Sequence, residues 1–290
     1  MSQVELVRAT TEDLVRLEGA LQTVVVDSGS PRQLDAMILL HGVGSNFYGS
    51  MLMESLAGAL VQMGISALRV NTRGHDTVST ARCGDGVKRV GAAYEIVADA
   101  CLDIAGWVEF LVTRGHRTIG VLGHSLGAVK ACYAMAHQPP PQVACVIPVS
   151  PPRLSCAAFR ESADSGRFSQ SLGEAESLVA AGRPDELFLS RFPFPTLMSA
   201  ACYVDKYGPA ERYNVLEFVD RIKCPSLYVF GQSEVEQGGI AFAGMPEAIR
   251  STEDTGRDLQ VVPGADHFYT GQAPVLIETV LNWLELRFSG

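Results

Sequence analysis

The fold is decided by one stretch of the chain, residues 118–137, which reads Thr118-Ile-Gly-Val-Leu-Gly-His-Ser-Leu-Gly-Ala-Val-Lys-Ala-Cys-Tyr-Ala-Met-Ala-His137. Residues 118–122 are an apolar run typical of a buried strand, and residues 127–137 are typical of a helix. Between them lies a G-x-S-x-G pattern, which is weak evidence alone because the chain holds 28 glycines. The strand–turn–helix setting strengthens it, since this is where a serine is held on a sharp, strained turn.

Ser125, at the centre of this pattern, is the predicted nucleophile. The two flanking glycines are expected because a side chain at either position would collide with the strand or helix crossing close by. The serine would lie above the carboxyl edge of the sheet, where open α/β sheets bind ligands. It would also lie at a helix N-terminus, whose backbone N–H groups favour developing negative charge.

The rest of the chain repeats the alternation of short apolar runs with longer helical segments. Strands are expected at 36–40, 65–70, 118–122, 143–149, 226–230 and 259–262, and helices at 51–63, 94–113, 127–137 and 273–286. This alternation predicts a mostly parallel sheet covered by helices on both faces. Residues 4–26 are expected to add an antiparallel hairpin at the sheet edge.

One segment, residues 153–214, breaks the alternation. It is punctuated by glycine, proline and serine, and it shows short helical patterns but no convincing strand. It also holds eight aromatic residues, Phe159, Phe168, Phe188, Phe192, Phe194, Tyr203, Tyr207 and Tyr213. We expect a helical lid inserted over the carboxyl edge of a core formed by residues 1–152 and 215–290. The rings would either line a substrate pocket or form the lid's own small core.

A serine hydroxyl is a weak nucleophile, so the prediction requires a base. His267 lies just past the last expected strand, in a loop that returns to the same edge of the sheet. His75 is its main competitor, whereas His41 and His124 flank the motifs and are expected to be structural. The alternative for His267 is an ordinary histidine on a surface loop.

The base in turn needs an acid that orients it, from the end of an earlier strand. Glu234 follows the expected strand at 226–230 and is the first choice, with Glu236 as the alternative. Asp266 ranks lower because neighbouring side chains on an extended loop point apart.

A turn that reads His41-Gly-Val-Gly44 follows the expected strand at 36–40. The backbone amide of Val43 is expected to be one donor of an oxyanion hole, and the amide of Leu126, after the nucleophile, the other. Each such donor stabilises the transition state by roughly 3 kcal/mol. The alternative is that the two glycines simply allow a turn after a strand.

Three other charged residues are expected to have structural rather than catalytic roles. Arg73 and Asp76 are expected to brace loops beneath the site through paired hydrogen bonds. Lys130, five residues after the nucleophile, is expected to be a solvated or loop-bracing charge.

The composition of this 290-residue chain narrows the function classes. Its net charge of −9 repels phosphate groups, so neither nucleic acid nor a membrane is an expected partner. The seven scattered cysteines and six histidines show no ligand spacing, so no metal is expected. No signal peptide pattern or membrane span is visible, which favours a soluble, cytoplasmic protein. Whether the chain forms a homo-oligomer is left open.

Over nearly its whole length the chain resembles the α/β-hydrolase-fold serine hydrolases. The resemblance rests on His41-Gly-Val-Gly-Ser-Asn-Phe-Tyr48, Asn71-Thr-Arg-Gly-His-Asp76 and Gly123-His-Ser-Leu-Gly127, which together are similar to a subgroup related to the siderophore-esterase-like hydrolases. It implies the α/β-hydrolase fold and esterase chemistry on a small-molecule carboxylic ester, without a cofactor. The chain order Ser125, Glu234, His267 matches the family's order. One departure is that the family's acid is most often Asp.

The expected function is therefore that of a serine hydrolase, which cleaves a carboxylic ester through an acyl-enzyme on Ser125. The aromatic content of the lid suggests an apolar or aromatic substrate. The same side chains could instead hydrolyse a C–C bond, a lactone or an amide, and the motifs do not separate these reactions. A non-catalytic ligand-binding module on the same fold is the alternative from another class.

Overall fold

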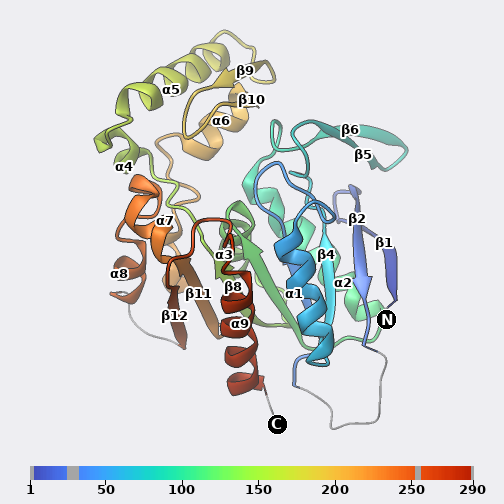
Figure 1. The fold of residues 1–290 in the computed structure, drawn as a ribbon. Coiled ribbons are helices and arrows are strands. Elements are labelled where there is room, and N and C mark those ends of the chain that lie inside the picture. Colours follow the sequence, from blue (N-terminus) through green and yellow to red (C-terminus); the bar gives the residue numbers. More distant parts are fainter. Residues whose placement is uncertain (1–2, 25–32, 252–255, 289–290) are drawn as a thin grey trace.

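The computed structural model describes residues 3–24, 33–251 and 256–288, and at its centre lies an eight-stranded sheet (Figure 1). In order across the sheet the strands are β1 (Val4–Thr10), β2 (Arg16–Gln22), β4 (Ser66–Val70), β3 (Ala36–Leu40), β7 (Ile119–His124), β8 (Val143–Val149), β11 (Ser226–Gly231) and β12 (Arg257–Val262). The strands from β4 onward in this order run parallel, while β1 and β2 pair antiparallel at one edge. The predicted mostly parallel sheet and edge hairpin are confirmed. Residues 25 and 26 of the predicted hairpin lie outside the described residues.

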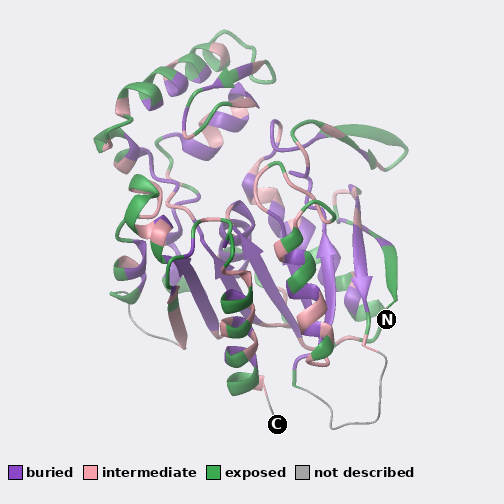
Figure 2. Cartoon of the chain, in the orientation of Figure 1, coloured by how far each residue is buried: buried purple, intermediate pink, exposed green. Residues whose placement is uncertain are grey.

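Helices cover both faces of this sheet because its central strands carry apolar side chains on both faces. In β3, Ile38 and Leu40 belong to one core cluster, whereas Met37 belongs to the cluster on the opposite face. The covering helices are α2 (Ala100–Thr113) and α3 (Leu126–His137) on the first face, and α1 (Met51–Gln62) and α9 (Ala273–Phe288) on the second. The sheet centre is accordingly buried (Figure 2). No helix among the described residues is both long and apolar enough to cross a membrane.

The segment between β8 and β11 forms a cap, residues 153–214, which lies beyond the carboxyl ends of the parallel strands (Figure 1). It contains α4 (Cys156–Glu161), α5 (Ser165–Ala180), β9 (Leu187–Ser190), β10 (Thr196–Ser199) and α6 (Ala200–Tyr207). The expectation that this segment holds no strand is wrong, because β9 and β10 pair as an antiparallel hairpin. Each strand has only four residues, which is too short for an alternating pattern to stand out.

Most aromatic rings of the cap form its own core. The ring centroids of Phe159, Phe168 and Phe192 lie between 4.8 and 5.4 Å apart, and all three side chains are buried. Of the eight rings, only Phe159, Phe194 and Tyr207 also line the cavity described below. The aromatic content of the cap therefore mainly stabilises the cap itself.

The long helix predicted at 94–113 begins later than expected. A 3₁₀ turn, η1 (Val97–Asp99), precedes α2, and Ile96 before it is extended. Glu95 is buried and forms an ion pair with Lys130 of α3. The chain around Glu95 is therefore not helical, although the spacing of the neighbouring apolar residues favours a helix, because this carboxylate is buried against Lys130.

The remaining predicted helices and strands are confirmed with ends shifted by two residues at most. The sequence patterns do not predict several short elements, namely β5 (Ser79–Cys83), β6 (Gly86–Val90), η2 (Val215–Glu217), η3 (Val219–Arg221), α7 (Gln232–Gln237), η4 (Gly239–Ala241) and α8 (Met245–Arg250). With three to six residues each, they are too short to show a period.

Candidate active site

Ser125 lies on a sharp turn between β7 and α3. Its φ of 57° is in the left-handed region that non-glycine residues rarely adopt, so the turn is strained. A Cβ at position 123 would lie 2.2 Å from the carbonyl oxygen of Gly127, and one at position 127 would lie 2.5 Å from that of His41. The expectation that close approach requires both flanking glycines is confirmed.

The side chains of Ser125, His267 and Glu234 form one hydrogen-bonded chain. The Oγ of Ser125 lies 3.0 Å from Nε2 of His267, and Nδ1 of His267 lies 2.8 Å from Oε2 of Glu234. The Glu234 carboxylate can only accept hydrogen bonds, so Nδ1 of His267 carries the ring proton. Nε2 of His267 therefore faces the serine hydroxyl as an acceptor. The structure therefore brings together three residues that follow the ends of β7, β11 and β12.

Glu234 is held by groups whose contact with it no sequence pattern indicates. Its Oε1 accepts hydrogen bonds from the Ser150 hydroxyl at 2.5 Å and from the Gly231 backbone N–H at 2.8 Å. The Tyr269 hydroxyl lies 3.0 Å from Oγ of Ser150, and both side chains are fully buried. With His267 on Oε2, both carboxylate oxygens are engaged, so the longer glutamate side chain is fixed in one position.

The alternative candidates Glu236, Asp266 and His75 have hydrogen-bond partners other than Ser125 and His267. Glu236 is exposed, and its carboxylate accepts a hydrogen bond from the side chain of Gln232. Asp266 is also exposed and accepts two backbone N–H groups of its own loop. The ring of His75 pairs with Asp76, with 2.9 Å between Nδ1 and Oδ2. These partners account for all three candidates without the nucleophile.

The loop after β3 lies directly beside the nucleophile. A Cβ on Gly42 would lie 3.2 Å from Cβ of Ser125. Val43 follows in this loop, and Leu126 opens α3, where the first N–H groups of a helix have no acceptor within it. Both residues line the same cavity as Ser125. The two predicted oxyanion donors are thus on the same wall as the serine hydroxyl.

His41 holds this loop in shape as a neutral ring. Its Nδ1–H donates to the carbonyl oxygen of Gly42 at 2.7 Å, and its Nε2 accepts the backbone N–H of Thr72 at 3.3 Å. Burial, together with the nearby Lys130 ammonium, lowers the pKa of His41 to about 3. The Gly42 carbonyl and the Val43 N–H belong to one planar peptide unit, so fixing the carbonyl also fixes the direction of that amide.

Lys130 lies on the buried side of α3, so the expectation of a solvated charge is wrong and that of a bracing charge is confirmed. Its Nζ lies 2.5 Å from Oε1 of Glu95 and 2.8 Å from Oγ1 of Thr72. Lys206 of the cap lies 3.7 Å from the other oxygen of Glu95. Burial raises the pKa of Glu95, but the two ammonium groups outweigh it and hold that pKa below its ordinary value.

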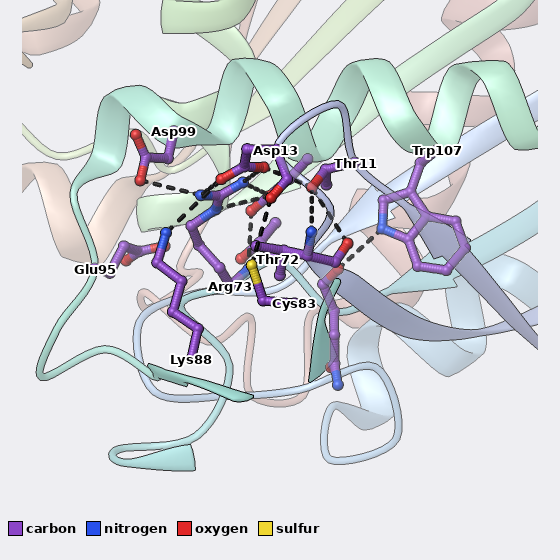
Figure 3. Close-up of polar contacts among 12 residues, drawn as sticks. Thr11, Asp13, Thr72, Arg73, Cys83, Lys88, Glu95, Asp99 and Trp107 are labelled. Atoms are coloured by element: carbon purple, nitrogen blue, oxygen red, sulfur yellow. Dashed lines mark hydrogen bonds and ion pairs between the residues drawn. The ribbon is translucent and has the colours of Figure 1, made fainter. Parts of the chain in front are cut away.

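Arg73 is a bracing residue, as expected (Figure 3). Its guanidinium donates two hydrogen bonds of 2.9 Å to Asp13, and it also bonds Asp99 at 3.1 Å and Asp103 at 2.9 Å. The paired bonds from Arg73 lower the pKa of Asp13 to about 2. This hub ties the turn between β1 and β2 to the start of α2.

His124, directly before the nucleophile, is also structural. Its Nε2–H donates to the carbonyl oxygen of His267 at 2.7 Å, which ties the turn of Ser125 to the loop of His267. Burial lowers the pKa of His124 to about 4, so the ring is neutral at pH 7. In the described ranges, no group of three or more His, Cys, Asp or Glu side chains is placed to hold a metal ion.

A cavity of about 1120 Å³ opens between the core and the cap, and both Ser125 and His267 line it. Its walls come from the start of α1, the cap, η4 and the loop after His267. Large apolar side chains dominate these walls, among them Leu52, Leu154, Phe159, Phe194, Phe242 and Phe268. The arrangement places a serine hydroxyl and an imidazole on the wall of a large apolar chamber.

Comparison with known proteins identifies the architecture. The sequence model of the alpha/beta hydrolase family matches residues 37–278 of the chain. No curated protein matches the chain in sequence.

Solved structures resemble the chain over nearly its whole length. The alpha/beta hydrolase GrgF from Penicillium sp. sh18 is 15% identical, with a TM-score of 0.69 and 98% of each chain covered. The esterase Pf2001 of Pyrococcus furiosus is 20% identical, with a TM-score of 0.57, and the match covers 100% of this chain and 94% of the other. Est1E from Butyrivibrio proteoclasticus, with bound ferulic acid, is 17% identical, with a TM-score of 0.65, 96% of this chain and 97% of the other covered. These likenesses confirm the fold expected from the sequence.

Proposed function

Because the chain belongs to the alpha/beta hydrolase family, we propose that it is a serine hydrolase with Ser125 as nucleophile, His267 as base and Glu234 as the orienting acid. The observation that carries this proposal is the hydrogen-bonded chain of these side chains, which ends at a serine on a cavity wall. A carboxylic ester is the proposed substrate, in line with the resemblance of the motifs and with the esterase among the similar structures.

In the proposed reaction, Nε2 of His267 takes the proton of the Ser125 hydroxyl as Oγ attacks the ester carbonyl. The Nδ1–H of His267 stays bonded to Glu234, whose carboxylate stabilises the imidazolium. The imidazolium then gives its proton to the leaving alcohol, and the acyl group stays on Oγ. A water molecule, deprotonated by His267, attacks this acyl-enzyme and releases the carboxylic acid.

The tetrahedral intermediates carry a negative oxygen that needs donors. We assign this role to the backbone amides of Val43 and Leu126, each worth roughly 3 kcal/mol when aimed at the oxyanion. The hydrogen bond from His41 to the Gly42 carbonyl supports the assignment, because it fixes the peptide that carries the Val43 amide.

The proposed substrate is apolar or aromatic in the part that enters the cavity. The aromatic content of the cap gives little support to this proposal, since most of those rings form the cap core. The cavity lining supports it better, because Phe194, Phe242 and Phe268 gather around the chamber that holds Ser125.

Labelling with a fluorophosphonate probe, combined with hydrolysis of 4-nitrophenyl acetate, tests the nucleophile. Wild type is expected to react with the probe and turn over the ester, while Ser125→Ala loses both, with kcat reduced by roughly 10⁴-fold or more. Glu234→Gln should lose most activity, whereas the matched exposed control Glu236→Gln should keep it. Normal turnover by a folded Ser125→Ala protein would refute the proposal.

The same proteins can be used to test which type of bond the site hydrolyses. A panel containing an ester, a thioester, a lactone, an amide and a β-diketone should show the highest kcat/KM for the ester. Preference for the diketone or the amide would move the proposal to C–C or amide hydrolysis by the same residues. Absence of labelling together with absence of turnover would favour a ligand-binding module instead.

A further inference from the structure

The described residues that line the cavity beside Ser125 include no Lys, Arg, Asp or Glu. Twenty-eight described residues line it, and none of these is Lys, Arg, Asp or Glu, although such residues make up 19% of the chain. The polar residues that do line it are hydroxyl-bearing side chains, such as Ser45, Ser55 and Thr270, and histidines. Such a wall offers hydrogen bonds but no counter-ion.

Four of the five titratable side chains in the described lining of the cavity, namely those of His41, His124, Tyr207 and Tyr269, are neutral at pH 7. Burial lowers the pKa of His41 to about 3 and that of His124 to about 4. Burial also raises the pKa of the phenols of Tyr207 and Tyr269, which therefore stay protonated. His267 is the one remaining titratable side chain of the described lining, and it is engaged between Ser125 and Glu234.

Two buried carboxylates, those of Glu234 and Glu95, are bound to other side chains and are not among the residues that line the cavity. Glu234 accepts hydrogen bonds from Ser150, Gly231 and His267 and is almost fully buried. Glu95 lies in contact with Lys130 and is likewise buried. A charged ligand in the cavity would therefore meet no group in the described wall able to replace its lost hydration.

The cavity is also large, and part of its apolar lining is exposed to solvent. Its volume of about 1120 Å³ is above the range of roughly 300–1,000 Å³ that is common for drug-sized ligands. Three of the large apolar side chains that line it are exposed as well, Met51 at 84%, Phe268 at 71% and Phe194 at 47%. The apolar surface thus continues from the chamber out to the solvent.

We propose that this site takes large uncharged esters and excludes esters with a carboxylate, phosphate or ammonium group on the part that enters the cavity. The inference rests on the proposed hydrolase function. A charge that enters loses hydration without gaining a partner, and the effective penalty for burying an unpaired ion is large. Anionic groups are disfavoured further by the net charge of −9.

Four 4-nitrophenyl esters with acyl chains of equal medium length test this exclusion. Their chains end in a methyl group, a neutral carboxamide, a carboxylate or a trimethylammonium group. We expect kcat/KM of the carboxamide ester within about tenfold of the methyl ester, and of both charged esters lower by about a hundredfold or more. Equal kcat/KM for the carboxamide and charged esters, with 4-nitrophenyl acetate still hydrolysed, would overturn the exclusion and leave the hydrolase proposal standing.

A charge placed in the wall should reverse part of this selectivity. Ala241 and Phe194 line the cavity from the core side and from the cap, and neither belongs to the proposed reaction machinery. Ala241→Lys should raise kcat/KM for the carboxylate ester at least tenfold over the matched Ala241→Met variant. Phe194→Lys against Phe194→Met repeats the comparison on a more exposed side chain, in case a lysine at position 241 prevents folding. Equal carboxylate turnover within both pairs would contradict the proposal.

A binding experiment keeps the inference testable even if no ester is cleaved. Ser125→Ala protein is loaded with Nile red, a neutral apolar dye, and titrated with decanamide, decanoate and decylammonium. Decanamide should displace the dye at concentrations at least about tenfold lower than either ion. Displacement by the ions at the same concentration as the amide would refute the exclusion, whatever the outcome of the activity measurements.

Discussion

Glu234, the proposed acid, has one methylene more than the aspartate expected most often at this place from the resemblance. The extra methylene adds a rotatable bond, so its carboxylate would be less well placed without further contacts. The Ser150 hydroxyl and the Gly231 amide both bind Oε1, which leaves Oε2 directed at His267. Ser150 itself has a φ of 52°, so the backbone is strained at the residue that binds Glu234.

Removal of the Ser150 hydroxyl should therefore impair turnover more than binding. In Ser150→Ala, Glu234 loses its 2.5 Å hydrogen bond, and we expect kcat to fall about tenfold with little change in KM, alongside a stability loss of roughly 1–3 kcal/mol. Steady-state kinetics across pH and urea unfolding measure the two effects.

Tyr269→Phe is the matched control, because it removes the hydroxyl behind Ser150 but none of the groups that touch Glu234. It should lower the free energy of unfolding with a smaller change in kcat. If both variants lose activity equally, Ser150 has no distinct role in positioning the acid.

At the residue scale, the sequence could nominate Ser125, Glu234 and His267 because each lies within five residues of the end of a recognisable strand. Their roles in a reaction stay predictions. Ser150 also follows a strand, but nothing in the local pattern distinguishes it from any other serine at a strand end. Lys130 could not be foreseen as buried, since its partner Glu95 lies 35 positions away in the chain.

At the scale of elements, a buried cluster joins the cap to the helix of the nucleophile. Lys130 comes from α3, Glu95 from the segment before η1, and Lys206 from α6 of the cap. Two ammonium groups thus share one carboxylate. In the described part of the chain, neither Oε2 of Glu95 nor Nζ of Lys206 has a hydrogen-bond partner.

This imbalance predicts opposite outcomes for two substitutions. Glu95→Gln leaves two buried ammonium groups without an anion, which should cost about 3–5 kcal/mol of folding free energy. Lys206→Met removes the less well bonded cation and keeps an apolar stem of similar length, so stability should change by about 1 kcal/mol or less, or increase. Urea unfolding followed by circular dichroism measures both. Equal losses in the two variants would show that the cluster needs all three charges.

Elements were predictable where a long apolar run or a full helical period was present. The strands at 36–40 and 143–149 match in full because each is a continuous apolar run that is buried in the sheet. The start of α2 was not predictable, because the burial of Glu95 is a tertiary effect. Likewise, β9 and β10 form by pairing with each other. A pattern of four residues cannot indicate that pairing.

At the scale of the whole molecule, two buried neutral histidines make stability depend on pH. The pKa values of His41 and His124 are lowered to about 3 and about 4 in the folded protein, against about 6.5 in an unfolded chain. Between pH 6.5 and about 4 the unfolded chain therefore binds more protons than the folded one. The free energy of unfolding should fall as pH falls through this window, by up to about 1.4 kcal/mol per pH unit for each ring.

Urea unfolding at pH 7, 6 and 5 measures this slope. His124→Gln keeps a side-chain N–H donor near the carbonyl oxygen of His267 but cannot titrate, so its slope should be smaller than that of wild type. Identical slopes would mean that His124 does not contribute to the acid sensitivity.

The Arg73 hub has a practical consequence for anyone who trims the protein. The family match starts at residue 37, after the first two strands, yet β2 pairs along β4 and the half-buried Asp13 binds the buried guanidinium of Arg73. A fragment cut at that boundary would remove β2 from β4, expose a strand edge prone to aggregation, and deprive the Arg73 guanidinium of one of its counter-ions. Truncated versions intended for crystallisation or immobilisation should therefore retain the opening hairpin, even though sequence-based domain limits would discard it.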